Sequence, residues 1–423
     1  MTTNWSWLGP RLAALRDAKG WSRRDLADAL GCDPTSIGHW ETGAHKPTPA
    51  NLVELRRVLA PGVLEPPTRR VNGSSRLVPL LDPVERMVEA AVMAAGAAAM
   101  CHFRPVPVLD GTFGRRNNPT LLADVEATEA LLKSIVPDLE ALTRPQGWRF
   151  AVYGEELRRG KDAKVDAMVD ASLAKLPSHG GIVRSDAEFA SKLGLVGCQA
   201  NPMLGVCFDA VDGSGNLELG LGGLFVSAAA IFDGTELLAG AVYDPHGGVL
   251  YSAVSHPGGD GHPPVRRARM RHVRAGVVTD LDPSGVFGRR VLGVHISRTA
   301  KPERAAITAK LDELLSADLP ARGDHANAEV LFPGGLQALN CGQAALAFVA
   351  SRRFGAFVSP ITSTWDIAAG EALIRAAGGK VTDFDGLPIH YGAGPEKVSV
   401  IAAWDHDVHD RLVELLANTR HRA

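Results

Sequence analysis

A chain of 423 residues is too long for one small domain and predicts two domains, one of them large. With 45% hydrophobic and 22% charged residues, the composition is that of a soluble globular protein. A formal net charge of −2 at pH 7 excludes a strong bias towards acidic or basic partners, and it says nothing about nucleic acid.

Neither a membrane anchor nor a disulfide framework is predicted. The N-terminus has no basic segment followed by an apolar run, and the longest apolar stretch, near Ala90–Met100, is too short and alanine-rich to span a bilayer. A cytoplasmic location is therefore expected. The five cysteines are scattered and never in a CxxC spacing, which indicates neither disulfides nor a zinc site.

The first unit in chain order, from about Leu8 to Ala60, is predicted to be all-helical. Apolar residues recur there at helical spacing, and Gly31 falls between two helical segments. A stretch rich in Pro, Gly, Ser and Arg follows, which we interpret as an exposed linker. The predicted boundaries are 1–62 for the helical domain, 63–83 for the linker and 84–423 for the second domain.

From residue 84 onward, helical segments alternate with strand-like runs. Residues 223–232 and 237–242 are two such runs. One helix is predicted near 163–176. This alternation is typical of a mixed domain in which helices and sheets form layers.

The segment WSRRDLADALGCDPTSIGHWETG, which starts at Trp21, resembles the helix-turn-helix of phage-repressor-type transcription factors. Ser22 can cap the first helix of the pair, and Asp33 can cap the second with Pro34 at its first position. Ile37 would pack the second helix against the first. The resemblance implies a DNA-binding domain.

In such a motif, the residues that project outward face the major groove. Here these are Thr35, Ser36 and His39, while Arg23 and Arg24 lie where they could contact phosphates. The outward face has few of the side chains that read base edges best. A small helical bundle used for dimerisation or protein contacts remains the alternative.

The run VCFDAVDGSGN is strand-like until two carboxylates, Asp209 and Asp212, and then turns through glycines. Two aspartates at such a turn can share hard divalent cations, and the backbone carbonyl of Val211 adds another oxygen. Gly213 lets backbone amides approach a phosphate, and Ser214 can orient a nucleophilic water. Taken alone, the pattern also fits an ordinary turn with capping carboxylates.

The segment STWDIAAGEALIRAAGGKVTD, from Ser363, resembles the second signature of the inositol monophosphatase family. In that signature, a Trp-Asp pair opens a helix that ends in Gly-Gly, and Asp366 stands at the family's C-terminal metal ligand. A helix that stops at Gly378 would hold the Asp366 carboxylate at its positive end. This segment and the DxxDGS turn occur in the family's order.

Two segments could supply the remaining metal ligand. The run RFAVYGEE ends like the strand before the family's first metal-binding glutamate, which would be Glu155. Glu188 instead lies at a spacing from Asp209 that is closer to many relatives. We favour Glu155, because residues 89–96 and 118–127 resemble the family's opening helices in sequence and separation.

With Glu155 as the ligand, Asp124 matches the aspartate that pairs with the hydroxyl residue, here Ser214, around the attacking water. Residues 157–203 are then an insertion relative to the family. With Glu188 as the ligand, Asp162 or Asp166 would take the place of Asp124, and residues 102–160 would be the insertion.

The resemblance extends from residue 84 to the C-terminus. It implies a layered α-β-α-β-α sandwich, the sugar-phosphatase fold, preceded by the small all-helical domain. It also implies that Asp124, Asp212 and Ser214 act in catalysis and that Glu155, Asp209, Val211, Asp212 and Asp366 hold the metal.

The substrate would contact Gly213, Ser214, Asn340 and Cys341. Relatives usually have glycine where Asn340 stands and serine or threonine where Cys341 stands. These departures concern the substrate and leave the metal chemistry intact.

The implied activity is a Mg²⁺-dependent phosphomonoesterase for inositol monophosphate or a related small sugar phosphate. Magnesium is favoured because every proposed ligand is a hard oxygen donor. Fructose-1,6-bisphosphatase and 3′-phosphoadenosine nucleotide phosphatase remain alternatives. So does a metabolite-sensing transcriptional regulator that uses a phosphatase fold. The expected partners are a small phosphorylated metabolite, DNA, and a second copy in a homodimer.

Overall fold

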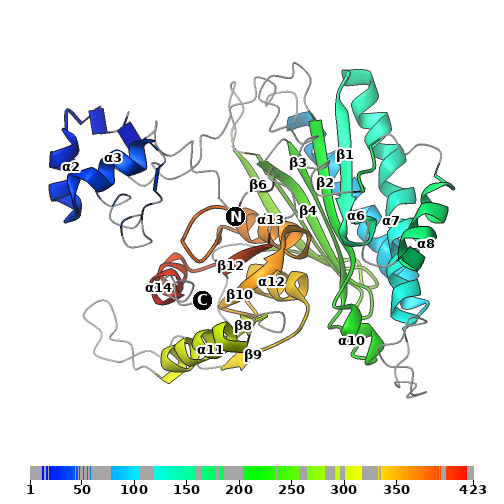
Figure 1. Ribbon diagram of the computed structural model, residues 1–423. Coiled ribbons are helices and arrows are strands. Elements are labelled where there is room, and N and C mark those ends of the chain that lie inside the picture. Colours follow the sequence, from blue (N-terminus) through cyan, green and yellow to red (C-terminus); the bar gives the residue numbers. More distant parts are fainter. Residues whose placement is uncertain are drawn as a thin grey trace.

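The computed structural model describes residues 12–13, 16–17, 19–42, 44–45, 47, 51, 55, 58, 78–103, 119–158, 163–176, 181–184, 203–233, 236–256, 264–281, 291–295, 301–316, 332, 335–389, 391 and 397–416. Asp162, Glu188 and residues 63–77 of the predicted linker lie outside these ranges. Figure 1 shows the arrangement of the described elements.

The N-terminal unit contains the predicted pair of helices, α2 (Arg23–Leu30) and α3 (Pro34–Thr42). Ser22 caps α2: its hydroxyl accepts from the backbone N–H of Asp25, whose carboxylate accepts from the N–H of Ser22. The Asp33 carboxylate accepts from the Thr35 N–H at 2.7 Å at the start of α3. The buried apolar residues of the two helices are Leu26, Ala27, Leu30, Ile37 and Trp40.

The second unit contains a sheet of seven strands (Figure 1). Its strands follow one another in sequence order, and only the first pair, β1 and β2, is parallel. The strands are β1 (Arg149–Gly154), β2 (Met203–Asp212), β3 (Val226–Asp233), β4 (Glu236–Asp244), β5 (Val249–His256), β6 (Val265–His272) and β7 (Val277–Asp280).

A second sheet of five strands has the order β11-β12-β10-β8-β9. Its central strand β10 runs parallel to β8 and antiparallel to β12. The strands are β8 (Leu292–Val294), β9 (Leu336–Gln337), β10 (Ala356–Ser363), β11 (Lys380–Thr382) and β12 (Lys397–Ala403).

Helices cover both sheets and separate them, which gives five layers. Helices α6 (Leu81–Met100) and α7 (Pro119–Thr143) pack on the outer face of the large sheet, with α8 (Ala163–Leu173) beside α7. Helices α12 (Gly342–Ala350) and α13 (Ala368–Ala376) lie between the sheets. Helices α11 (Lys301–Ser316) and α14 (His406–Leu416) cover the outer face of the small sheet. The predicted α-β-α-β-α order is confirmed.

The strand pattern explains how one sheet serves two cores. Along β3, Ala228, Ala230 and Phe232 belong to the core shared with α12 and α13, whereas Ala229 and Ile231 belong to the core under α6 and α7. Alternate side chains of a strand point to opposite faces. A strand buried on both faces therefore reads as a continuous apolar run, as β3 does.

The structure differs from the sequence interpretation at the linker boundary. A 3-10 turn, η2 (Val78–Leu80), leads directly into α6, so the last six residues of the predicted linker are helical. Leu81 is 4% exposed and Val84 is 1% exposed within the core under α6. Pro79 and Pro83 suggested a loop, but the segment is helical because this places Leu81 and Val84 in the core. Within the described ranges, no helix is long and apolar enough to cross a membrane.

Candidate metal centre

Glu155 and Asp209 are brought together by the parallel pairing of β1 and β2. Gly154, the last residue of β1, pairs with Phe208, so Glu155 follows the end of β1 beside Asp209, which is still within β2 and pairs with Ala228 of β3. Gly154 has to be glycine, because a Cβ atom there would lie 2.5 Å from the Phe208 ring. Glu155 then opens a 3-10 turn, η4 (Glu155–Leu157).

Asp366 reaches the same place from the second sheet. Strand β10 ends at Ser363 and continues into a 3-10 turn, η5 (Thr364–Asp366). One Asp366 oxygen accepts from the Thr362 hydroxyl at 3.0 Å and from the Ser363 N–H at 3.1 Å, which fixes the carboxylate. Ligand oxygens of Glu155, Asp209 and Asp366 all lie within 4.8 Å of one another.

Asp212 completes the acidic group at the end of β2. The pairing of β2 with β3 is irregular between Asp209 and Asp212. Within this irregularity the Val211 N–H donates to Asp209 Oδ1 at 3.0 Å. Asp212 Oδ2 accepts from the Gln343 N–H at 2.6 Å, in the first turn of α12. That helix N-terminus favours a negative charge at Asp212.

The three aspartates are buried, Glu155 is half-buried, and the charges of the four carboxylates repel one another. Burial, and then the charges of Glu155, Asp212, Asp366 and Asp124, raise the pKa of Asp209 well above its usual value. Burial and the charge of Asp366 raise the pKa of Asp212 to about 7. A divalent cation offsets both the repulsion and the cost of burial, and carboxylate oxygens suit hard ions such as Mg²⁺. The residues present therefore fit a divalent metal.

Asp124 and Ser214 lie on two elements that contact each other. Asp124 is in the first turns of α7, and Ser214 is the first residue of the short helix α10 (Ser214–Glu218). Both are half-buried. Gly213 precedes Ser214 with φ +85°, and a Cβ there would lie 2.7 Å from the Leu224 carbonyl oxygen, so this turn requires glycine. The pairing of Asp124 with Ser214 stays a prediction.

Asn340 and Cys341 form the entry to α12. Asn340 adopts φ 52°, in the left-handed region, where asparagine is tolerated better than most residues and glycine best. This gives a physical reason for the glycine expected there in relatives. Cys341 is 1% exposed, and its Sγ lies 3.4 Å from Asp212 Oδ2. Cys341 thus contacts the acidic group, whereas Asn340 is exposed.

Two buried amide side chains at the site were missed by sequence reasoning. Gln343 is 1% exposed and Asn216 is 5% exposed. Gln343 Nε2 donates to the Trp365 carbonyl, and Asn216 Nδ2 donates to the carbonyls of Leu224 and Leu339. For Gln343, the available signal was its position as a single polar residue within the apolar run CGQAALAFVA.

The alternative acids are only partly described. Asp166 does not belong to the group formed by Glu155, Asp209 and Asp366. Its Oδ1 instead lies 3.2 Å from Arg184 Nη2 in an ion pair. Asp162 and Glu188 lie outside the described ranges. Glu155 is thus the glutamate that the structure brings to Asp209 and Asp366, and its role as a ligand stays a prediction.

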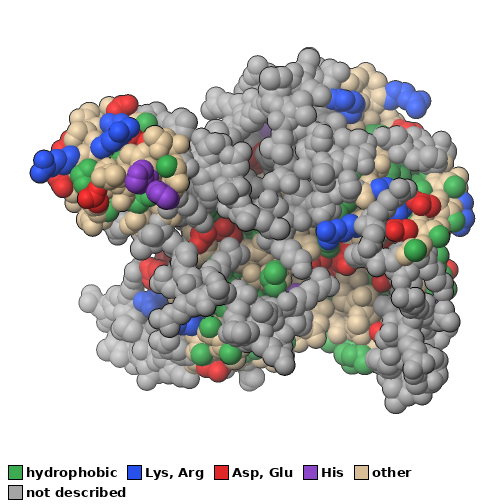
Figure 2. Space-filling view, viewed as in Figure 1, with side chains coloured by type: hydrophobic (Ala, Val, Ile, Leu, Met, Phe, Trp, Pro, Cys, Tyr) green, Lys and Arg blue, Asp and Glu red, His purple; other side chains and the backbone are tan. Residues whose placement is uncertain are grey.

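The residues predicted to face DNA lie on the surface of α2 and α3. Thr35 and His39 are exposed and Ser36 is half-buried. Figure 2 shows basic and histidine side chains on this surface. Arg23 Nε donates to Glu41 Oε2 at 2.6 Å, although 53% of its side chain remains exposed. Arg23 therefore also stabilises the helix pair.

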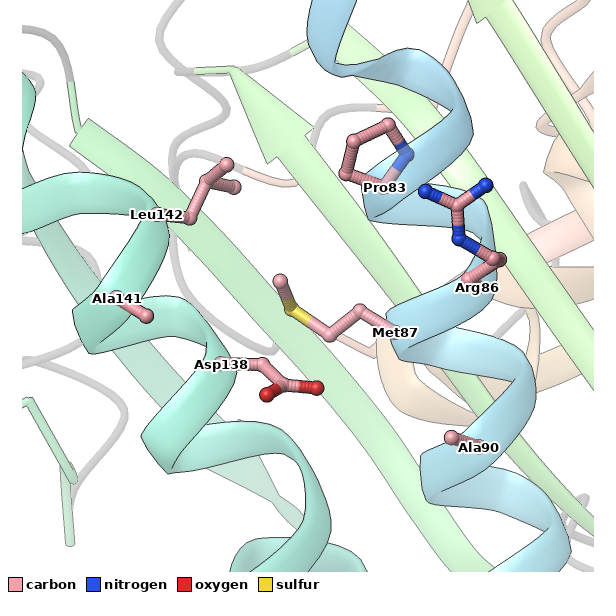
Figure 3. A pocket seen from close by; sticks show the side chains of 7 residues that line it. All are labelled: Pro83, Arg86, Met87, Ala90, Asp138, Ala141 and Leu142. Carbon is pink, nitrogen blue, oxygen red and sulfur yellow. The ribbon is translucent and has the colours of Figure 1, made fainter.

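A separate hollow lies between α6 and α7, in the outer layer (Figure 3). Met87 extends into it, and Asp138 comes from the facing helix. Asp138 is far along α7 from Asp124, on the order of 20 Å at 1.5 Å per residue. This hollow is therefore distinct from the acidic group.

Comparisons with known proteins agree on two families. Residues 226–421 match the model of the inositol monophosphatase family, and residues 7–61 match the model of a helix-turn-helix domain. An inositol-1-monophosphatase of Mesorhizobium japonicum is 30% identical over 178 residues, which are 42% of this chain and 56% of the relative. Inositol-1-monophosphatase ImpA of Mycolicibacterium smegmatis is 42% identical over 74 residues, 18% and 25% of the two chains.

The chain thus spans about half the length of the first of these relatives and a quarter of the second. Among solved structures, Mycobacterium tuberculosis SuhB has a TM-score of 0.47 at 18% identity, with 82% of this chain and 98% of that chain covered. From the two family matches, the chain carries a domain of the inositol monophosphatase family and an N-terminal helix-turn-helix domain.

Proposed function

We propose that the second domain is a Mg²⁺-dependent phosphomonoesterase that hydrolyses inositol monophosphate or a related small sugar phosphate. The observation that carries the proposal is the meeting of Glu155, Asp209 and Asp366, from two different sheets, within 4.8 Å. The pKa values of Asp209 and Asp212 are raised by burial and by neighbouring charges, and such an arrangement is typical of functional sites. The family match supports the same reaction class.

The metal would be held by Glu155, Asp209, Asp212 and Asp366, with the carbonyl of Val211 as a further oxygen. When bound, Mg²⁺ supplies positive charge that stabilises the phosphate oxygens and acidifies water. Asp124 would accept a proton from the attacking water, and Ser214 would orient that water. The glycine at 213 allows the backbone to approach the phosphate.

The rest of the substrate would contact the entry to α12. Cys341 lies against Asp212, and Asn340 is the exposed residue before it. Both differ from the residues that relatives usually have at these positions. Fructose 1,6-bisphosphate and 3′-phosphoadenosine nucleotides are therefore the alternative substrates.

The test is phosphate release from sugar phosphates, inositol phosphates and phosphoadenosine nucleotides, with and without Mg²⁺. We expect Mg²⁺-dependent turnover, reduced about 100-fold or more by Asp209→Asn and by Glu155→Gln. Glu156→Gln, at the adjacent residue of the same turn, is the matched control and should retain activity.

Two other results would be informative. Full activity of Glu155→Gln would exclude Glu155 as a ligand and favour Glu188. Absence of turnover on every substrate would contradict the enzyme proposal and favour a metabolite-sensing regulator.

We propose in addition that the helix-turn-helix domain binds DNA through α3. The family match and the exposure of Thr35 and His39 on that helix favour this second function.

A further inference from the structure

Gln343 contacts both of the chain segments that carry the buried aspartates. Its backbone N–H donates to Asp212 Oδ2 at 2.6 Å, at the end of the large sheet. Its side-chain Nε2 donates to the carbonyl of Trp365 at 2.7 Å, and Trp365 directly precedes Asp366. One residue thus holds a carboxylate from one sheet and the turn that carries a carboxylate from the other.

The second side-chain atom of Gln343 is also used. Gln343 Oε1 accepts from the N–H of Gly370 at 2.8 Å, in the first turn of α13. The N–H groups of a helix's first turn lack partners within the helix, so this bond satisfies one of them. Because Gln343 is 1% exposed, water cannot replace these bonds easily.

Asn216 also holds the start of α12 in place. Its Nδ2 donates to the Leu224 carbonyl at 2.6 Å and to the Leu339 carbonyl at 2.7 Å. Asn216 belongs to α10, which follows Asp212, and Leu339 belongs to the chain that enters α12. The start of α12 is therefore attached to the Asp212 turn by Asn216 and to the Asp366 turn by Gln343.

We propose that Gln343 is a positioning residue of the metal centre, which sets the separation of the Asp212 and Asp366 carboxylates and thereby the affinity for a divalent cation. The charges of these two aspartates repel each other in a buried site. Without the cation, repulsion favours a wider separation, and the bonds of Gln343 oppose it. This inference rests on the proposed metal-dependent function.

The test is calorimetric titration of the full chain with Mg²⁺ and with Mn²⁺, for wild type and Gln343→Met. Methionine has a similar length but neither donates nor accepts at these positions, while the backbone bond to Asp212 remains. Loss of groups that orient ligands costs about 10–100-fold in metal affinity. We expect a loss in that range, and an unchanged affinity for the control Gln337→Met, since Gln337 is exposed.

A purely structural role for Gln343 would lower the melting temperature without changing metal affinity well below it. Metal affinity within about twofold of wild type in the folded Gln343→Met variant would therefore overturn the proposal. If Gln343→Met does not fold, Gln343→Ala is measured with the same criteria. Wild type that binds no divalent cation would contradict the proposed function itself, which distinguishes the two failures.

Discussion

Asp233, at the end of β3, is a buried acid outside the metal centre. Asp233 is 8% exposed. Burial, together with the charge of Glu236, raises the pKa of Asp233 from its usual value of 3.8 to about 6. Between these two values the folded state keeps a proton that the unfolded state loses. The free energy of unfolding therefore falls as pH rises from about 4 to about 6.

Asp233→Asn removes this titration and keeps the shape of the side chain. We expect the variant to be more stable than wild type at pH 8, by at most about 3 kcal/mol, and equally stable at pH 4. Thermal melts from pH 4 to pH 8 measure the difference. Asp280→Asn, at an exposed position, is the control. A difference between Asp233→Asn and wild type that is the same at every pH would contradict the assignment.

Single residues differed in how far they could be predicted from sequence. Asp209, Asp212 and Asp366 stand in short local patterns with a glycine within four residues after each, so their motifs could be recognised. Gln343 could not, because its partners Trp365 and Gly370 lie 22 and 27 residues away, and its bonds exist only once α12 and α13 pack. Resemblance to the family led to Glu155, since spacing alone favoured Glu188.

Helix α3 is the element on which the DNA proposal depends. Thr35 is exposed in its first turn, where a negative charge favours the helix. Thr35→Glu should therefore leave the fold intact while repelling DNA phosphates. We expect about a tenfold or greater loss of affinity for DNA from the region of its own gene.

Band shifts at several stated salt concentrations measure this loss. Thr279→Glu, an exposed position on β7, adds the same charge elsewhere and should have little effect. If wild type shows no salt-sensitive binding, the DNA proposal is wrong.

Elements that contain a long apolar run or a helical pattern agreed with the sequence interpretation. Short elements that form only through pairing with a distant strand were not predicted. The run predicted at 237–242 lies within β4, and the helix predicted near 163–176 corresponds to α8. Strand β9 has only Leu336 and Gln337, and it exists through pairing with β8. No local pattern marks such a strand. The start of α6 was likewise hidden, because two prolines resemble a linker.

At the scale of the whole molecule, the five layers follow from alternating burial, and the family resemblance supplied their order. Contact between the two domains could not be predicted. Leu387 lies in a turn that is held by Asp383. Asp383 Oδ1 accepts from the backbone N–H groups of Asp385 and Leu387. Leu387 is 7% exposed and belongs to the buried cluster of the N-terminal helices. Nothing in the sequence around Leu387 indicates that partner.

Leu387→Ser should therefore loosen the N-terminal helices without affecting the acidic group. Removing a buried leucine side chain costs about 2–5 kcal/mol in a core, and at a contact between domains we expect the lower part of that range. Amide hydrogen exchange in residues 23–42 measures the effect, and it should become several-fold faster while phosphate release is unchanged. Val277→Ser, at a side chain that is 53% exposed, is the control. Unchanged exchange in Leu387→Ser would mean that the N-terminal helices are stable without this contact, so that the second domain could not influence the proposed DNA binding through it.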